Sequence, residues 1–299
     1  MRSLVLSFTI LIGATVILGG CTGTDSLSAR RVEIAQSPIT ENPSGKTFPG
    51  KFIWHDLLTP DPVLAGKFYE ELFGWQIDYE GQYAVVRNDG KLIAGILKVE
   101  PEEGSARDAL WMPSVSVADV DAAVILVEAN GGLVLNGPVD MDKRGRTALI
   151  SDPERADIVL LEAEGGAPED TDPAMGDWLW DEIWTNDPRN TEKFYSAVLG
   201  YDEIASGDDY DVFINEGEWR AGVRYVRDDF KHRLWVPVVR VADPLVTAGR
   251  VKGLGGVVWV APGEAPGNED TALIADTTGA LLLIQRWPSS TAEEGVDHE

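Results

Sequence analysis

Cysteine is almost absent from this 299-residue chain, whose single cysteine is Cys21. One cysteine excludes an intrachain disulfide and any metal centre built on several thiolates. Histidine is nearly as scarce, since only His55, His232 and His298 occur. The side chains that most often bind zinc or iron are therefore in short supply.

Positive charge is the second deficit. The chain has 25 Lys and Arg residues against 50 Asp and Glu residues, which gives a formal net charge of −25. Because nucleic-acid binding depends on Lys and Arg that neutralise phosphates, the sequence predicts no nucleic-acid partner. We interpret the acidic surplus as a contribution to solubility.

Long apolar runs are missing except at the N-terminus. Residues 4–18 are apolar and follow Arg2, which suits a secretory signal but is too short to span a membrane. The run ends in Leu-Gly-Gly-Cys21, which resembles the lipobox of bacterial lipoproteins. The resemblance implies that residues 1–20 are a signal peptide and that Cys21 is acylated, anchoring the protein to a lipid bilayer.

The position after the acylated cysteine is Thr22 rather than Asp. By resemblance to Gram-negative sorting signals, this implies a place in the bacterial cell envelope, on the outer membrane facing the periplasm. The alternative is an ordinary secretory peptide, or a short anchor helix, in which Cys21 is incidental.

Composition divides the remaining chain into tether, domains and tail. Residues 21–49 are rich in Ser, Thr, Pro and Gly and are predicted to be a flexible linker that carries the lipidated cysteine. Residues 165–176, GGAPEDTDPAMG, predict a second linker between domains at 50–164 and 177–287. Residues 288–299 form an acidic tail.

The two predicted domains repeat one another. WHDLLTPDPVLAGKFYEELFGW at 54–75 returns as WDEIWTNDPRNTEKFYSAVLGY at 180–201, with eight identities at one offset of 126 positions. A constant offset indicates duplication. The repeated unit is a strand, a helix that starts at Asp61-Pro62, and a glycine, Gly74, that ends it.

A second repeat links 111–119 to 235–243 and TALI at 147–150 to TALI at 271–274, with an offset of 124. Each domain then consists of two strand–helix–three-strand units. The sequence therefore predicts an α+β fold of two tandem modules, each made of paired βαβββ units. Paired sheets of this kind form a trough, which is the expected ligand site.

The repeated motifs resemble the vicinal oxygen chelate superfamily, which includes glyoxalase I, extradiol dioxygenases and bleomycin resistance proteins. The resemblance rests on W-x-[DE]-[LI]-x-T-x-D-P, K-F-Y, [FL]-G-[WY], W-x-P-x-V-x-V-x-D and T-A-L-I-x-D, and it covers residues 51–164 and 177–287. It implies the tandem fold but little about activity, because the family includes lyases, dioxygenases, transferases and non-catalytic binders.

The resemblance also implies where a metal would be bound. Family members use a His or Gln in the first strand of each half and a Glu in the last. The corresponding first-strand residues here are Trp54, Met112, Trp180 and Val236, and the last-strand residues are Val159 and Leu283. None suits a divalent ion, so we predict no metal and no other cofactor.

Strand alternation predicts which side chains face the trough. Trp54 and Asp56 should do so in the first module, and Trp180 and Glu182 in the second, which makes these four the predicted ligand-binding residues. Asp56 and Glu182 are also catalytic candidates, because desolvation could raise their pKa and make them general bases. The alternative is that both acids are structural.

His55 is the third catalytic candidate. Alternation places it on the face opposite Trp54, toward the helix, where its counterpart in the second module is Asp181. A register shift of one residue would turn it into the trough. His232 and His298 are expected to be solvated.

Three functions remain open at this point. The first is a metal-free, membrane-anchored, glyoxalase-like lipoprotein that binds a small aromatic or apolar molecule. The second is a lyase, isomerase or dioxygenase with a non-standard site around His55, Asp56 and Glu182. The third is a scaffold that binds another protein, and a homodimer is also left open.

Overall fold

The computed structural model describes residues 37–100, 108–227, 233–264 and 268–287. Cys21, the signal peptide, His232, His298 and the acidic tail lie outside these residues, and the expectations about them remain predictions. Within the described ranges, no helix has the length and apolar character needed to cross a bilayer.

Module 1, residues 50–164, contains two βαβββ units. The first has β1 (Phe52–Thr59), α1 (Pro62–Phe73), β2 (Gln76–Glu80), β3 (Tyr83–Asn88) and β4 (Lys91–Lys98). The second has β5 (Leu110–Ser116), α2 (Val120–Ala129), β6 (Leu133–Met141), β7 (Gly145–Ser151) and β8 (Asp157–Ala163).

Module 2, residues 177–287, repeats this order. Its first unit has β9 (Trp178–Thr185), α3 (Pro188–Leu199), β10 (Glu203–Ser206), β11 (Tyr210–Asn215) and β12 (Glu218–Tyr225). Its second has β13 (Leu234–Arg240), α4 (Pro244–Val251), the 3-10 turn η1 (Lys252–Leu254), β14 (Val257–Val260), β15 (Thr271–Ala275) and β16 (Leu281–Gln285).

Each module forms one eight-stranded sheet, which confirms the predicted fold. The strand orders are β2-β3-β4-β1-β5-β8-β7-β6 and β10-β11-β12-β9-β13-β16-β15-β14. The two units of each module meet where their first strands pair antiparallel, β1 with β5 and β9 with β13. The first strand of every unit therefore runs through the middle of its sheet.

The helices begin and end where the sequence predicts. Asp61 caps α1 by accepting the backbone N–H of Leu64 at 3.0 Å, and Asp119, Asp187 and Asp243 cap the other helices in the same way. Gly74 and Gly200, at φ of 79° and 78°, take the left-handed conformation that ends α1 and α3.

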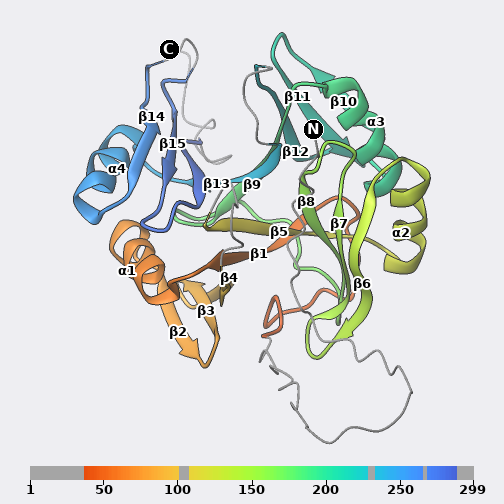
Figure 1. Ribbon diagram of the computed structural model, residues 1–299, viewed down its shortest axis with the longest axis horizontal. Helices are drawn as coiled ribbons and strands as arrows, with labels where there is room; N and C mark the ends of the chain where they lie inside the picture. Colours follow the sequence, from red (N-terminus) through yellow and green to blue (C-terminus); the bar gives the residue numbers. More distant parts are fainter. Residues whose placement is uncertain (1–36, 101–107, 228–232, 265–267, 288–299) are drawn as a thin grey trace, which may run out of the picture.

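The two modules pack crosswise through their helix-covered faces. In Figure 1, α1 lies beside α4 and α2 beside α3, so each unit of module 1 faces the opposite unit of module 2. One apolar core joins α1 and β1 to α4, β15 and β16, and a second joins α2 and β8 to α3 and β12. The hydrophobic core is thus shared by both modules.

Repeated motif residues form two of the polar clusters across this interface. The Tyr69 hydroxyl donates to Asp276 at 3.0 Å and accepts from Trp111 Nε1 at 2.9 Å. The same bonds, at the same distances, recur among Tyr195, Asp152 and Trp235. The Tyr of K-F-Y and the Asp of T-A-L-I-x-D therefore join the modules rather than line a ligand site.

Candidate functional site

The face of each sheet turned away from the helices is its trough face. On module 1 this face carries two apolar clusters, one around Trp54 and Tyr83 and the other around Met112 and Leu149. On module 2 it carries one cluster, which contains Trp180. Strand alternation therefore places the two predicted tryptophans correctly.

His55 lies on the opposite face, between the modules, as alternation predicts. Its Nε2 is 2.9 and 3.0 Å from the two carboxylate oxygens of Asp181, and its ring centroid is 4.1 Å from that of Trp178. His55 is only 2% exposed and Asp181 is fully buried. The pair joins the repeat-equivalent positions of the two modules, and His55 contacts neither trough.

Asp56 is held by three donors in module 1. It accepts from the Tyr83 hydroxyl at 2.7 Å, from Arg144 Nη1 at 2.9 Å and from Trp54 Nε1 at 2.9 Å. The Arg144 guanidinium also lies 4.8 Å from the centroid of the Trp54 ring. A buried cation and two neutral donors therefore hold Asp56 in the wall of the trough.

Glu182 has the same role in module 2. Arg224 donates to both of its oxygens, from Nε at 2.6 Å and from Nη2 at 2.9 Å. The Tyr210 hydroxyl and Trp184 Nε1 donate to it at 3.0 and 3.2 Å. The structural interpretation of both acids thus has direct geometric support, while their roles in ligand binding and catalysis remain predictions.

A repeated Tyr–Gly pair builds each acid site. Tyr83 crosses Gly95, and Tyr210 crosses Gly222, with the same spacing of 12 residues. A Cβ on either glycine would lie 1.8 Å from the tyrosine oxygen. Burial raises the pKa of both hydroxyls well above the usual range, so they stay neutral donors. The repeated spacing would have revealed these tyrosines from the sequence.

The two arginines could not have been found by comparing the repeats. Arg144 comes from the turn between β6 and β7, in the second unit of module 1, whereas Arg224 lies on β12, in the first unit of module 2. The position on β4 that corresponds to Arg224 holds Leu97. Each acid is therefore paired with an arginine, but the arginine comes from a different element in each module.

Part of the predicted N-terminal tether covers the trough of module 1. We call residues 37–49 the covering segment. Ile39, which is buried, packs with Trp54 and Tyr83, and the Ser37 carbonyl lies 3.4 Å from Arg144 Nη2. This portion of the linker therefore packs against the domain, because Ile39 finds an apolar surface there.

The trough of module 2 carries an aromatic cluster, defined as Trp180, Tyr210, Trp219 and Trp287, of which Trp219 is exposed and the others are half-buried. From the centroid of Trp180, the other rings lie 6.2 Å (Tyr210), 6.2 Å (Trp219) and 5.5 Å (Trp287) away. Trp219 is nearly parallel to Trp180, at 23°, and remains 55% exposed. Trp54, the counterpart of Trp180, is by contrast almost fully buried.

The indole N–H of Trp180 is buried and has no hydrogen-bond partner among the described residues. In module 1 the equivalent N–H of Trp54 donates to Asp56. Glu182 is one methylene longer than Asp56 and bonds Trp184 instead. A buried donor without an acceptor costs free energy of folding, so an unpaired N–H at this position is unusual.

The residues at the expected metal positions do not fit a metal ion. Trp54, Met112 and Val159 lie in the apolar clusters of module 1, and Trp180, Val236 and Leu283 in that of module 2. They offer no imidazole or carboxylate. In the part of the chain that the structure describes, no three His, Cys, Asp or Glu side chains gather as a metal site.

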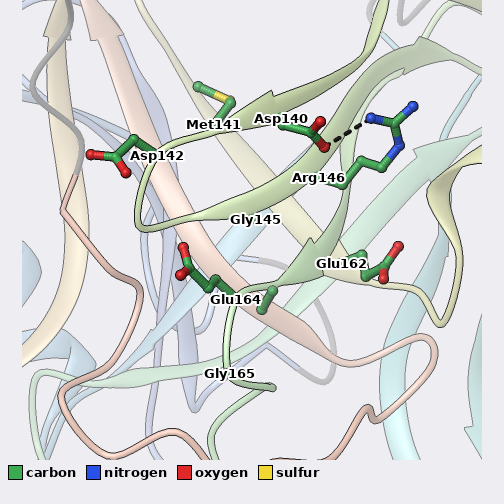
Figure 2. Close-up of a pocket in the computed structure, with 9 residues that line it drawn as sticks. Asp140, Met141, Asp142, Gly145, Arg146, Glu162, Glu164 and Gly165 are labelled. Atoms are coloured by element: carbon green, nitrogen blue, oxygen red, sulfur yellow. Dashed lines mark hydrogen bonds and ion pairs between the residues drawn. The ribbon is translucent and has the colours of Figure 1, made fainter.

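A separate hollow of about 500 Å³ lies between the β6–β7 hairpin and the end of β8. Its rim carries Asp140, Asp142, Glu162, Glu164 and Arg146. Figure 2 shows Arg146 bonded to Asp140, at 2.8 Å, and Arg146 also pairs with Asp121 on α2. This acidic hollow contains none of the predicted ligand-binding residues and no aromatic ring.

Known proteins with the same architecture now define the class. Residues 52–160 match the model of the glyoxalase/bleomycin resistance protein/dioxygenase superfamily. The chain is 30% identical, over 247 residues, to "Putative glyoxylase CFP32" of Mycobacterium bovis, covering 77% of this chain and 92% of that protein. The chain therefore belongs to this superfamily, as its repeated motifs predict.

Further relatives match this chain over most of their length. The anthracycline biosynthesis protein DauV of Streptomyces sp. strain C5 is 28% identical over 259 residues, which cover 79% of this chain and 93% of that protein. The Mn(II)-bound glyoxalase of Novosphingobium aromaticivorans superposes with a TM-score of 0.58 at 15% identity, over 81% of this chain and 83% of that one. At this identity the likeness concerns the fold alone.

Proposed function

We propose that this protein is a tandem glyoxalase-like binding protein that takes a planar aromatic molecule on the trough face of module 2. The aromatic cluster carries the proposal. Trp219 presents its ring to solvent beside three half-buried rings, and offset or edge-to-face contacts with such rings contribute about 0.5–1.5 kcal/mol each beyond burial. Trp219, at 55% exposure, has area left for a ligand to cover.

Module 2 is favoured over module 1 because its cluster reaches solvent. In module 1, Ile39 and the covering segment lie against Trp54 and Tyr83, and Arg144 is only 5% exposed. In module 2, the Arg224 side chain is 38% exposed and borders Tyr210, with its guanidinium 4.9 Å from the ring centroid. One binding site per chain is therefore the proposed stoichiometry.

The proposed site binds no metal, because the six positions where family members place metal ligands hold apolar side chains in this chain. A lyase, isomerase or dioxygenase remains the alternative function, and one relative is named as a glyoxylase. That alternative would require an unpaired acid or base near the ligand, whereas Asp56 and Glu182 each pair with an arginine. Stoichiometric metal in protein purified without a His tag would favour the alternative.

Fluorene-2-carboxylate is a suitable probe for the test, because it is planar, aromatic and soluble. Calorimetric titration of residues 22–299 should give saturable binding to one site. Trp219→Ala should weaken binding about tenfold, since it removes one face of the cluster. Trp259→Ala is the control, because Trp259 is equally exposed, at 62%, but lies on β14 outside the cluster.

Two results would count against the proposed site. Absence of saturable binding would reject an aromatic ligand of this size. An equal loss of affinity in Trp219→Ala and Trp259→Ala would show that the probe binds exposed indoles without a defined site.

We also propose that acylated Cys21 anchors the protein to the cell envelope. The Leu-Gly-Gly-Cys sequence supports this, together with the segment of 15 residues that separates Cys21 from the start of the described chain. Expressed with its signal in a Gram-negative host, the protein should partition into detergent and sediment with outer membranes. Cys21→Ser should be found in the aqueous phase. Equal partitioning of the two forms would reject the anchor.

A further inference from the structure

The buried N–H of Trp180 distinguishes the two trough sites. Both modules contain a trough-facing Trp, an acid, a tyrosine that reaches the acid and an arginine that neutralises it. In module 1 the acid accepts from Trp54 Nε1, from the Tyr83 hydroxyl and from Arg144 Nη1, so the trough-facing indole has its acceptor. In module 2 the acid is equally saturated, but by Trp184, and Trp180 Nε1 is left over.

The leftover donor cannot be satisfied by the acid beside it. Glu182 already accepts four hydrogen bonds, two from Arg224, one from Tyr210 and one from Trp184, which fills its usual acceptor capacity. An unpaired buried N–H carries a desolvation cost, which a ligand oxygen would remove on binding once the rings beside Trp180 shift to admit it. A ligand that covers the aromatic cluster should therefore carry an acceptor oxygen for this N–H.

The covering segment shows how a trough of this kind is filled. In module 1 the occupant places an apolar group, Ile39, against Trp54 and Tyr83, and a carbonyl oxygen, that of Ser37, beside Arg144. The occupant thus combines an apolar body with an acceptor oxygen. Module 2 offers the same two kinds of surface, its aromatic cluster for the apolar body and a donor for the oxygen, but here the unpaired donor is Trp180 Nε1 rather than the arginine.

We infer that the ligand of module 2 is a planar aromatic compound bearing a carbonyl-type acceptor oxygen, which accepts the hydrogen bond of Trp180 Nε1. This inference rests on the proposed function and names the substrate class of the same site. The exposed ring of Trp219 covers one face of the ligand, and the ring of Trp287, inclined at 65° to that of Trp219, meets the edge of the ligand. Arg224 lies at the edge of the cluster, where its bonds to Glu182 hold the guanidinium in place.

A matched pair of probes isolates the contribution of the ligand oxygen to affinity. 9-Fluorenone-2-carboxylate and fluorene-2-carboxylate share ring system and charge, and differ in the ketone oxygen at carbon 9. Calorimetric titration of residues 22–299 should show about tenfold tighter binding of the fluorenone, because only it satisfies the buried N–H. The preference is read as a ratio of two dissociation constants, which a general change in stability does not alter.

Two variants locate the preference. Trp180→Phe keeps an aromatic ring but removes the N–H, so both probes should weaken and their ratio should fall to about one. Trp219→Phe is the matched control, because it trims another ring of the cluster while leaving the Trp180 N–H in place. It should weaken both probes and preserve the ratio.

The outcomes separate this inference from the proposed function. Equal binding of both probes to the unaltered protein would overturn the acceptor oxygen and leave the aromatic site standing. A preference that persists in Trp180→Phe would place the oxygen elsewhere and would also overturn it. Failure of both probes to bind would instead reject the proposed function itself.

Discussion

At the residue scale, the two acids of the troughs act as fixed parts of the wall. Glu182 is 2% exposed and depends on Arg224 for its counter-charge, just as Asp56 depends on Arg144. Removing one partner of a buried ion pair leaves an uncompensated charge, which costs more than the pair itself contributes. The arginine is therefore a structural requirement of the trough wall.

We predict that Arg224→Met lowers the free energy of unfolding by about 2 kcal/mol. This is below the 3–5 kcal/mol typical of fully buried pairs, because Arg224 is partly exposed and water screens its charge. The double variant Arg224→Met with Glu182→Gln should recover most of the loss. Urea unfolding measures all three proteins, and a double variant no more stable than the single one would contradict the pairing.

Asp152 gives a pH-dependent prediction. Burial, the largest cause, raises its pKa to about 6, against hydrogen bonds from Tyr195 and backbone N–H groups that lower it. A raised pKa means that the folded state holds the proton where the unfolded state, near 3.9, has lost it. The contribution of Asp152 to stability is thus full below about pH 4 and is lost as pH rises through 6.

The size of this effect is up to about 3 kcal/mol, from two pKa units at 1.36 kcal/mol each. Asp152→Asn should lack it, so the difference in unfolding free energy between the two proteins should change between pH 4 and 7. Asp142→Asn, at an exposed turn, is the control. Parallel pH profiles for Asp152→Asn and the unaltered protein would contradict the prediction.

At the element scale, the covering segment is what distinguishes the trough of module 1 from that of module 2. It is held by backbone bonds from Gly45 to Gly165 and from Ala167 to Lys46, both within 2.9 Å, and by the Arg87–Glu41 ion pair at 2.8 Å. The backbone bonds join the N-terminal segment to the linker between the modules, and the ion pair joins it to β3. They place Ile39 over the trough of module 1.

We predict that Ile39→Ala lowers the unfolding free energy by about 2 kcal/mol, at the low end for a buried isoleucine because the segment lies at the rim. Binding of fluorene-2-carboxylate should keep its affinity, since the proposed site is in module 2. Asn42→Ala, exposed in the same segment, is the control. Loss of probe affinity in Ile39→Ala alone would move the site to module 1.

The elements themselves were largely predictable from the sequence. The repeated Asp-Pro and glycine positions mark where helices begin and end. Strand alternation placed Trp54, His55 and Trp180 on the correct faces. The covering segment was not predictable, because Ile39 is a lone apolar residue among turn formers and its burial depends on a surface built by distant strands. Arg144 and Trp287 were missed for the same reason.

At the scale of the whole molecule, the crosswise packing makes each module depend on the other. The core around α1 includes Val239, Val251 and Ile284 of module 2, and the core around α2 includes Phe194 and Trp235. A module expressed alone would expose half of each core. The triads of Tyr69 and Tyr195 would also lose their partners.

We therefore predict that residues 177–287 alone do not form a stable monomer. Co-expressed with residues 37–164, they should form a one-to-one complex that regains the near-ultraviolet circular dichroism of the intact protein. Multi-angle light scattering gives the stoichiometry. A folded, monomeric module 2 with a cooperative melting transition would contradict a shared core.

The location of the ligand is the central claim, and indole N–H signals test it most directly. The chain has ten tryptophans, and ¹H–¹⁵N spectra resolve each side chain during titration with 9-fluorenone-2-carboxylate. We predict that the signals of Trp180, Trp219 and Trp287 shift, with Trp180 moving downfield, while Trp54 and Trp111 stay in place. Shifts centred on Trp54, with Trp180 unmoved, would contradict the account.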